Sequence, residues 1–161
     1  MKLSEYIKKY GDCEVTDEID KCIVKAPKTV YDLKYGDRYF FLTAIGTIMT
    51  GIWHGDSSDY NRINFGNVFL TEEDVEFARE RLEVIDDLKM YAKEFSVEEW
   101  KNLGLNKHCI KYDFRVCRVE VIVSFSVKGT ELYFESEEKA QEAIKAVGED
   151  RIKKYYLGVK E

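Results

Sequence analysis

The sequence predicts an α+β fold, in which a pair of short N-terminal helices is followed by two antiparallel β-β-β-α units. A chain of 161 residues is the length of one compact domain or of two small fused units. Apolar residues recur with a period of two in residues 118–127 and at steps of three and four in residues 71–94, which indicates strand and helix respectively. Because short turns separate the strands, the sheets are expected to be antiparallel.

The N-terminal region, residues 1–27, is predicted to form the two short helices. Ser4 is a candidate helix cap and Gly11 a stop signal, and the second helix must end before Pro27, the only proline. Residues 28–95 then form the first β-β-β-α unit, and residues 96–161 form a linking helix and the second unit.

Turn signals divide the first unit into three strands. Tyr35-Gly36-Asp37 is a predicted turn, and residues 38–43 and 47–53 form a hairpin around the turn at residues 44–46. The polar residues 54–59 are expected to be a loop, and residues 62–69 a third strand with a bulge at Gly66-Asn67. Thr71 then caps a helix that reaches Glu94, the longest element, with acids in its first turn.

The second unit begins after a short helix capped by Ser96. Residues 108–114, 118–127 and 130–134 are predicted strands, and Ser136 caps a helix that Gly148 ends. A last short turn follows at residues 150–156. The alternating residues Val119, Val121, Val123, Phe125 and Val127 share one face, which is expected to be buried. The strand–cap–helix junctions of the two units align at an offset of 65 residues, which fits either a duplication or a common junction.

Composition narrows the class of protein. The longest apolar runs are far shorter than a membrane span, and the N-terminus lacks the apolar core of a secretory signal, so a soluble cytoplasmic protein is expected. The chain is acidic, with net charge −6, and it has no basic block, which argues against direct nucleic-acid binding. The spacing of the four cysteines fits neither a zinc site nor a disulfide scaffold, so we expect no metal and no cofactor.

The negative charge is concentrated in one segment. Residues 1–70, 71–104 and 105–161 carry −1, −6 and +1. Within the middle segment, five carboxylates recur at helical spacing along one stripe of the predicted helix: Glu72, Glu76, Glu80, Glu83 and Asp87. Such a row can resemble nucleic-acid phosphates and dock on a basic channel, or it can be an ordinary solvated helix face that Arg79 and Arg81 partly neutralise. Both interpretations stay open.

The alternative catalytic site is the loop Trp53-His54-Gly55-Asp56. His54 and Asp56 are a possible acid–base pair, and Trp53 a possible stacking wall. No nucleophile or metal motif accompanies them, and Trp53 is more simply a core residue. His108-Cys109 is excluded as a dyad, because adjacent residues of a strand point to opposite faces. The chain is therefore predicted not to be an enzyme.

Two regions resemble small accessory proteins of phages and prophages in low-GC Gram-positive bacteria. The first runs from Thr29 to Ala92 and includes Tyr31-Asp32-Leu33-Lys34-Tyr35-Gly36-Asp37-Arg38-Tyr39, Gly66-Asn67-Val68-Phe69 and Thr71-Glu72-Glu73. The second runs from Tyr133-Phe134 to Gly148-Glu149-Asp150-Arg151-Ile152-Lys153-Lys154-Tyr155-Tyr156. That group shares no catalytic motif, and the resemblance implies a viral accessory role.

Genes of that kind often encode inhibitors of host defence, including anti-CRISPR proteins. The resulting hypothesis is a non-catalytic inhibitor of a host defence nuclease, with the acidic stripe as its partner-binding surface. The expected partner is a host protein, such as a Cas nuclease or its ribonucleoprotein complex. The alternatives are a small enzyme at the Trp53-His54-Asp56 loop and an interaction module with another partner.

Overall fold

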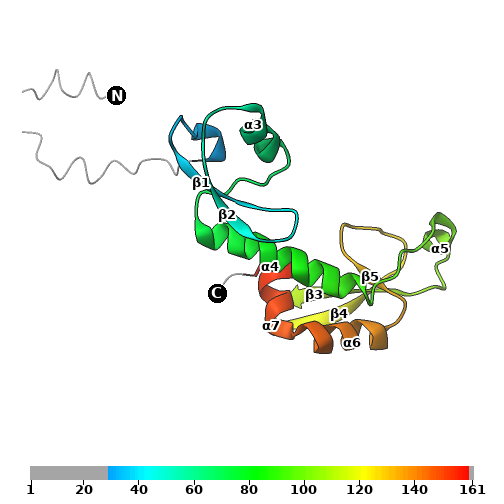
Figure 1. The fold of residues 1–161 in the computed structure, drawn as a ribbon. Coiled ribbons are helices and arrows are strands. Elements are labelled where there is room, and N and C mark those ends of the chain that lie inside the picture. Colours follow the sequence, from blue (N-terminus) through cyan, green and yellow to red (C-terminus); the bar gives the residue numbers. More distant parts are fainter. Residues whose placement is uncertain (1–28, 160–161) are drawn as a thin grey trace, which may run out of the picture.

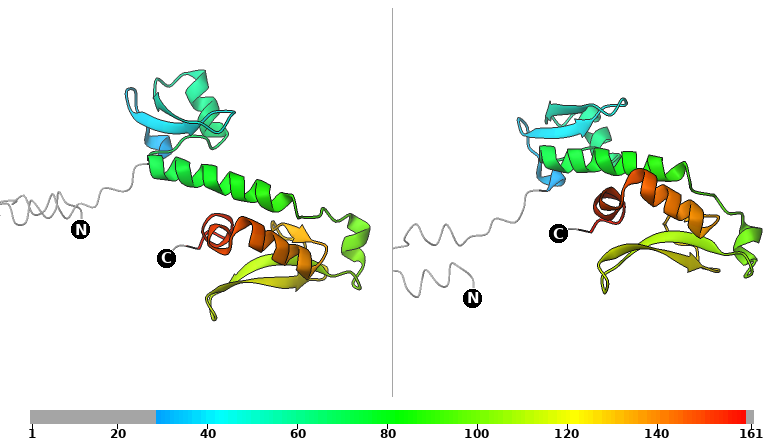
Figure 2. Two further views of the ribbon diagram at one scale, coloured as in Figure 1. Left: turned by 60° about the horizontal axis from the view of Figure 1, so that its bottom comes forward. Right: turned by 90° about the horizontal axis from the view of Figure 1, so that it is seen from below.

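The protein has a long central helix with a small β-rich unit at each side of it (Figures 1 and 2). The computed structural model describes residues 29–159, so the predicted N-terminal helical pair lies outside the described residues. Within them the class is α+β, as predicted. The elements, in chain order, are the 3-10 helix η1 (Val30–Asp32), β1 (Arg38–Leu42), β2 (Ile48–Ile52), α3 (Ser57–Asn64), α4 (Glu72–Lys89), α5 (Val97–Lys101), β3 (Lys107–Asp113), β4 (Arg118–Ser124), β5 (Tyr133–Phe134), α6 (Glu137–Val147), α7 (Glu149–Arg151) and the π-helix η2 (Ile152–Tyr156).

The first sheet contains only the β1–β2 hairpin, in antiparallel register. The predicted third strand at residues 62–69 is wrong, because residues 57–64 form α3. The edge of β1 that does not pair with β2 is nevertheless occupied. The Asn67 side-chain amide exchanges two hydrogen bonds of 2.8 Å with the backbone of Leu42, and Phe69 forms an isolated bridge with Phe40. A side chain and one bridging residue therefore take the place of a strand.

The second sheet has the order β4-β3-β5, and both of its pairings are antiparallel. The sequence predicted that short turns connect all neighbouring strands. This is wrong here, because β5 pairs with β3 and not with β4. The chain therefore crosses from one edge of the sheet to the other between β4 and β5. Only Tyr133 and Phe134 form the last strand.

The predicted burial of the alternating face of residues 119–127 holds in part for two of its five residues and is wrong for the other three. Val119 and Val121 pack against the core of the second unit, whereas Val123, Phe125 and Val127 are 39%, 55% and 74% exposed. Cys117 lies in the exposed turn between β3 and β4, with φ of 54°.

The long helix was predicted to extend to Glu94, but α4 ends at Lys89. The chain then extends, and the Lys93 N–H donates to the carbonyl of Tyr133 in β5 (2.7 Å). Phe95 is buried beside Cys109 and Tyr133, so tertiary packing replaces the last predicted helical turn. The caps by Thr71, Ser96 and Ser136 are confirmed, since each side chain accepts a backbone N–H three residues later.

The helix α6 ends where predicted, at Gly148, whose φ of 96° suits glycine. Residues 149–156 then form α7 and a π-helical turn, in which the Leu157 N–H donates to the carbonyl of Ile152 (2.9 Å). This C-terminal segment packs against α4.

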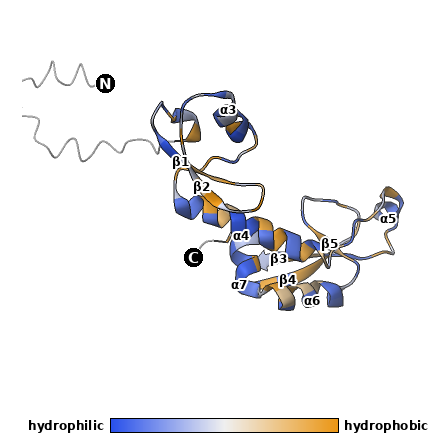
Figure 3. Cartoon of the chain, in the orientation of Figure 1, coloured by the Kyte–Doolittle hydropathy of each residue, from blue (hydrophilic) through white to orange (hydrophobic). Residues whose placement is uncertain are grey.

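Three buried clusters form the interior. The largest joins α4, α6 and the second sheet through Val84, Leu88, Ile110, Phe134, Ala140, Ala143, Val147 and Ile152. The second lies under the hairpin (Leu33, Tyr39, Trp53, Val68), and the third under α5 (Phe95, Cys109, Tyr133). Polar and apolar residues alternate along α4 (Figure 3), as expected for a helix that packs on both units. No helix among residues 29–159 is long and apolar enough to cross a membrane.

Candidate functional site

The acidic stripe lies on α4, where the five carboxylates occupy successive turns of one continuous helix. Its two halves differ in their surroundings. Glu72 and Glu76 are exposed, and neither takes part in an ion pair within the described part of the chain. The other three acids, Glu80, Glu83 and Asp87, are engaged by arginines.

Arg151 of α7 is the main partner of these three acids. Its guanidinium nitrogens lie 3.4 Å from Glu80, 3.8 Å from Glu83 and 3.5 Å from Asp87. Arg79 lies 3.7 Å from Glu80 and 3.8 Å from Glu83. All these side chains are partly exposed, so each pair contributes about 0–1 kcal/mol. The C-terminal half of the stripe thus helps to hold α7 on α4, and Glu72 and Glu76 form its open half.

The first turn of α4 carries two further acids, Glu73 and Asp74, which strengthen the negative field at this end of the molecule. They stand at the positive end of the helix dipole, where carboxylates are favoured. Both border a groove of about 560 Å³ that also contains Lys153 and Lys154. Lys153 and Lys154 reduce the negative field in this groove. The open half of the stripe is therefore more strongly negative than the groove.

The residues of the alternative catalytic loop have structural contacts. Trp53 is buried, as predicted, and its ring packs edge-on against Tyr39 and Tyr60. The Asp56 carboxylate caps α3 by accepting the Asp59 N–H (3.0 Å). The exposed His54 ring packs against Tyr35, with 5.4 Å between ring centres.

Asp59, which the sequence analysis did not single out, is the centre of a buried network. Its carboxylate accepts the Tyr39 hydroxyl (2.7 Å) and the N–H groups of His54 (2.8 Å) and Gly55 (3.0 Å). Arg62 donates to the Tyr39 hydroxyl (2.8 Å) and lies 3.7 Å from Asp59. No sequence signal links these residues, because Tyr39 and Asp59 are 20 positions apart.

The electrostatics of this network follow from its contacts. Burial alone would raise the pKa of Asp59, but the hydrogen bonds from Tyr39, His54 and Gly55 outweigh burial and bring that pKa below its ordinary value. Burial, with the hydrogen bond to Asp59, raises the pKa of Tyr39. The network therefore favours an ionised Asp59 and a neutral tyrosine.

Ligand atoms of His54, Asp56 and Asp59 all lie within 4.8 Å of one another, which makes this the one candidate cation cluster in the described part of the chain. Asp59 already accepts three hydrogen bonds and Asp56 one. These bonds explain the position of both carboxylates without an ion.

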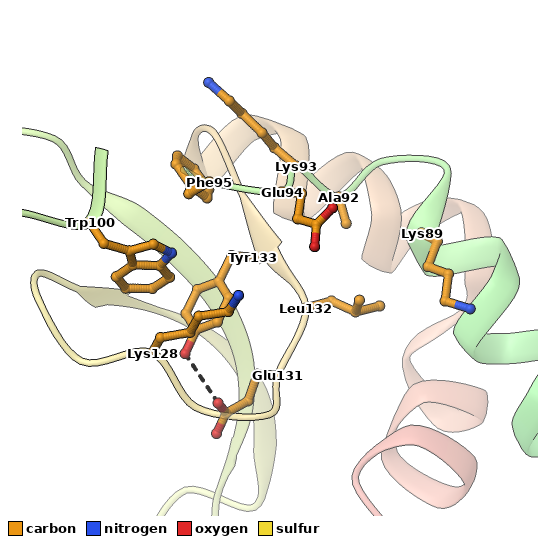
Figure 4. Close-up of a pocket in the computed structure, with 10 residues that line it drawn as sticks. All are labelled: Lys89, Ala92, Lys93, Glu94, Phe95, Trp100, Lys128, Glu131, Leu132 and Tyr133. Atoms are coloured by element: carbon orange, nitrogen blue, oxygen red, sulfur yellow. Dashed lines mark hydrogen bonds between the residues drawn. The ribbon is translucent and has the colours of Figure 1, made fainter. Parts of the chain in front are cut away.

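A cleft that the sequence did not predict lies between the end of α4, α5 and β5 (Figure 4). Its volume is about 370 Å³, within the range of small-ligand pockets. The ring of Trp100 meets Phe95 and Tyr133 edge-on, at 6.1 and 4.8 Å between centres. The Tyr133 hydroxyl accepts the Gly129 N–H (2.7 Å) and donates to Glu131, and burial raises its pKa.

The charges of this cleft are largely paired. Lys93 forms a 2.9 Å ion pair with Glu99, and the hydrogen bond from the Ser96 N–H, with this pair, holds the pKa of Glu99 at about 2. Glu131 pairs with Lys111, whose hydrogen bond lowers the Glu131 pKa. Lys128 and Glu94 line the cleft and form no ion pair among residues 29–159. They carry opposite charges, so the cleft selects neither an anion nor a cation.

Comparison of the chain with known protein families, with curated proteins and with solved structures yielded no match. A function is therefore inferred from the chain's own surfaces. Of these surfaces, we single out the open half of the acidic stripe, whose carboxylates are exposed and form no ion pair within residues 29–159.

Proposed function

We propose that the protein is a non-catalytic binding protein that acts inside a bacterial host cell and inhibits a defence nuclease. The acidic stripe of α4 docks on the basic surface where the nuclease holds nucleic acid. The observation that carries this proposal is a row of carboxylates on one rigid helix, with Glu72 and Glu76 exposed and free of ion pairs within the described residues. The partner class, a Cas nuclease or its ribonucleoprotein complex, rests on the resemblance to phage accessory proteins.

The physical mechanism is competition by charge. Complementary fields speed the encounter of a negative surface with a positive groove, and this effect weakens as salt rises. A helix is a suitable support, because its carboxylates are held at a fixed spacing of about 5–6 Å per turn. The Arg79 and Arg151 contacts reduce the charge of the C-terminal half, so the open half is expected to lead the encounter.

Reversal of Glu72 and Glu76 to lysine is expected to slow association with the partner about tenfold at low salt, because the leading charge of the stripe changes sign. The partner is first captured from a lysate of a host that carries a defence nuclease, and association is then measured by surface plasmon resonance. Inhibition of nucleic-acid cleavage by the captured nuclease is measured in parallel. Association with the partner and inhibition of cleavage should weaken together in this variant.

The matched control reverses Glu137 and Glu142 on α6. This pair also combines a first-turn acid with a mid-helix acid, both exposed, and gives the same change in charge. If the α4 and α6 variants associate equally fast and inhibit equally well, the stripe is an ordinary solvated helix face and the proposal fails.

Replacement of Arg151 by glutamine tests the other half of the stripe. It removes the main cation beside Glu80, Glu83 and Asp87, so we expect association to become several-fold faster at low salt. Three weak surface pairs are lost, and the melting temperature should fall only slightly. Unchanged or slower association would show that these three acids do not contribute to docking.

A further inference from the structure

Within residues 29–159, the second sheet leaves one of its two edges open. On the β5 side, the Lys93 N–H bonds to the Tyr133 carbonyl, so that edge is covered by the chain itself. On the other side, β4 is the last strand of the order β4-β3-β5. An open edge presents unpaired N–H and C=O groups on which another strand can form.

The register identifies which groups of β4 point outward. The Val119 N–H bonds to the Glu149 carboxylate (3.2 Å) and therefore not to β3. Inward and outward groups alternate along an antiparallel strand. The backbone groups of Val119, Val121 and Val123 consequently face away from β3, and Glu149 occupies only one of them.

The side chains along this edge are also suited to pairing. Ile122 and Val123, two β-branched residues of this edge strand, are 41% and 39% exposed. Natural edges are commonly protected by proline or by free charges. This strand has no proline, and its two charges, Arg118 and Glu120, pair with each other at 2.7 Å.

We propose that β4 pairs antiparallel with β4 of a second copy of this chain, about a two-fold axis at Val121. The strand Arg118–Ser124 has Val121 at its midpoint, and Val121 is one of the outward-facing residues. An axis at this midpoint lets all seven residues of the strand pair with the second copy. The pairing joins two three-stranded sheets into one continuous six-stranded sheet.

The register places compatible side chains opposite one another. Val119 meets Val123 of the second copy, Glu120 meets Ile122, and Arg118 meets Ser124, so no like charges face directly. The other open edge, β2, is less suitable, because it has five residues and includes Gly51, which weakens a strand. The contact with Glu149 is the one hydrogen bond of the described residues that the dimer must replace.

Sedimentation equilibrium of the full chain tests the pairing, with Val123→Pro as the disruptive variant and Val123→Thr as the matched control. Proline removes an outward N–H that β3 does not use, whereas threonine keeps both the N–H and the β-branched shape. The parent and Val123→Thr should dimerise as concentration rises, and Val123→Pro should dimerise at least about tenfold more weakly. A parent that stays monomeric at every concentration, or a proline variant that dimerises like the control, overturns the proposal.

Cross-linking tests the register and does not depend on the folding of the proline variant. Glu120→Cys and Ile122→Cys are made separately, in a chain whose Cys13, Cys22 and Cys117 are serine and whose Cys109, the β3 partner of Ile122, is alanine. The two variants are then mixed under mild oxidation. Non-hydrogen-bonded partners are about 4.5 Å apart between Cα atoms, which permits a disulfide. A disulfide-linked dimer should form in the mixture and much less with Glu120→Cys alone. Equal cross-linking in both samples contradicts the axis at Val121.

Discussion

Replacement of Asp59 by alanine is expected to lower the free energy of unfolding by about 3–5 kcal/mol at neutral pH, because three hydrogen-bond donors lose a buried, charged acceptor. The Asp59 side chain is almost fully buried and accepts the Tyr39 hydroxyl and two backbone N–H groups. Without it, these three donors lose their acceptor, and the Arg62 guanidinium loses the negative charge that lies 3.7 Å away. Urea unfolding followed by circular dichroism measures the change.

The control is Asp86→Ala, which removes an exposed carboxylate in a surface pair with Lys89 and should change stability by less than about 1 kcal/mol. Equal effects of the two substitutions would contradict a structural role for the Asp59 network.

The stability of the parent and of Asp59→Ala should also depend differently on pH in the acid range. The folded-state pKa of Asp59 lies below its unfolded value of about 3.9, so its stabilisation is present above that pH and is lost as the pH falls through the folded-state pKa. Asp59→Ala should lack this part of the acid dependence.

Three helix starts, those of α4, α5 and α6, were predictable because they depend on local chemistry. Thr71, Ser96 and Ser136 each satisfy an orphan N–H three residues later, and an acid follows within the first turn. The end of α4 was not predictable in the same way. Residues beyond Lys89 continue the helical pattern, but Lys93 is drawn into pairing with β5 by contacts that are 40 positions apart.

The missed helix α3 has a physical explanation as well. Its sequence, SSDYNRIN, has only Tyr60 and Ile63 as apolar residues at helical spacing. Both contact the hairpin cluster, and the buried Asp59 adds a polar attachment. Residues 65–69, which were predicted as part of a third strand, contact β1. They do so through the Asn67 amide and one bridge at Phe69, which no strand pattern describes.

The candidate site was predictable only in part. The spacing of the five acids placed them on one face of a helix, since that spacing depends on helix geometry alone. Their division into an open half and a paired half depends on Arg151, which is 64 residues from Asp87 along the chain. The Trp100 cleft likewise joins α4, α5 and β5 through aromatic contacts that leave no periodic signal.

Replacement of Phe134 by alanine is expected to destabilise the second unit by about 3–5 kcal/mol, because it leaves a large cavity in the main core. Phe134 is fully buried in β5, directly opposite His108 of β3. The helix that covers it presents Ala140 and Ala143, whose small side chains cannot extend into the vacated space. The loss should therefore be close to the upper end of the range for a large-to-small substitution.

Phe114→Ala provides the matched control, since it removes the same side chain from a position that is 73% exposed, and it should cost less than about 1 kcal/mol. Thermal unfolding by calorimetry compares the two variants, and near-ultraviolet circular dichroism reports whether the Trp100 cleft, which shares β5 through Tyr133, keeps its packing. Because α6 and α4 both contact this cluster, the loss should also loosen the docking of α4 that holds the acidic stripe in place. If Phe134→Ala unfolds at the same temperature as Phe114→Ala, then the packing of α6 on β5 does not stabilise the fold.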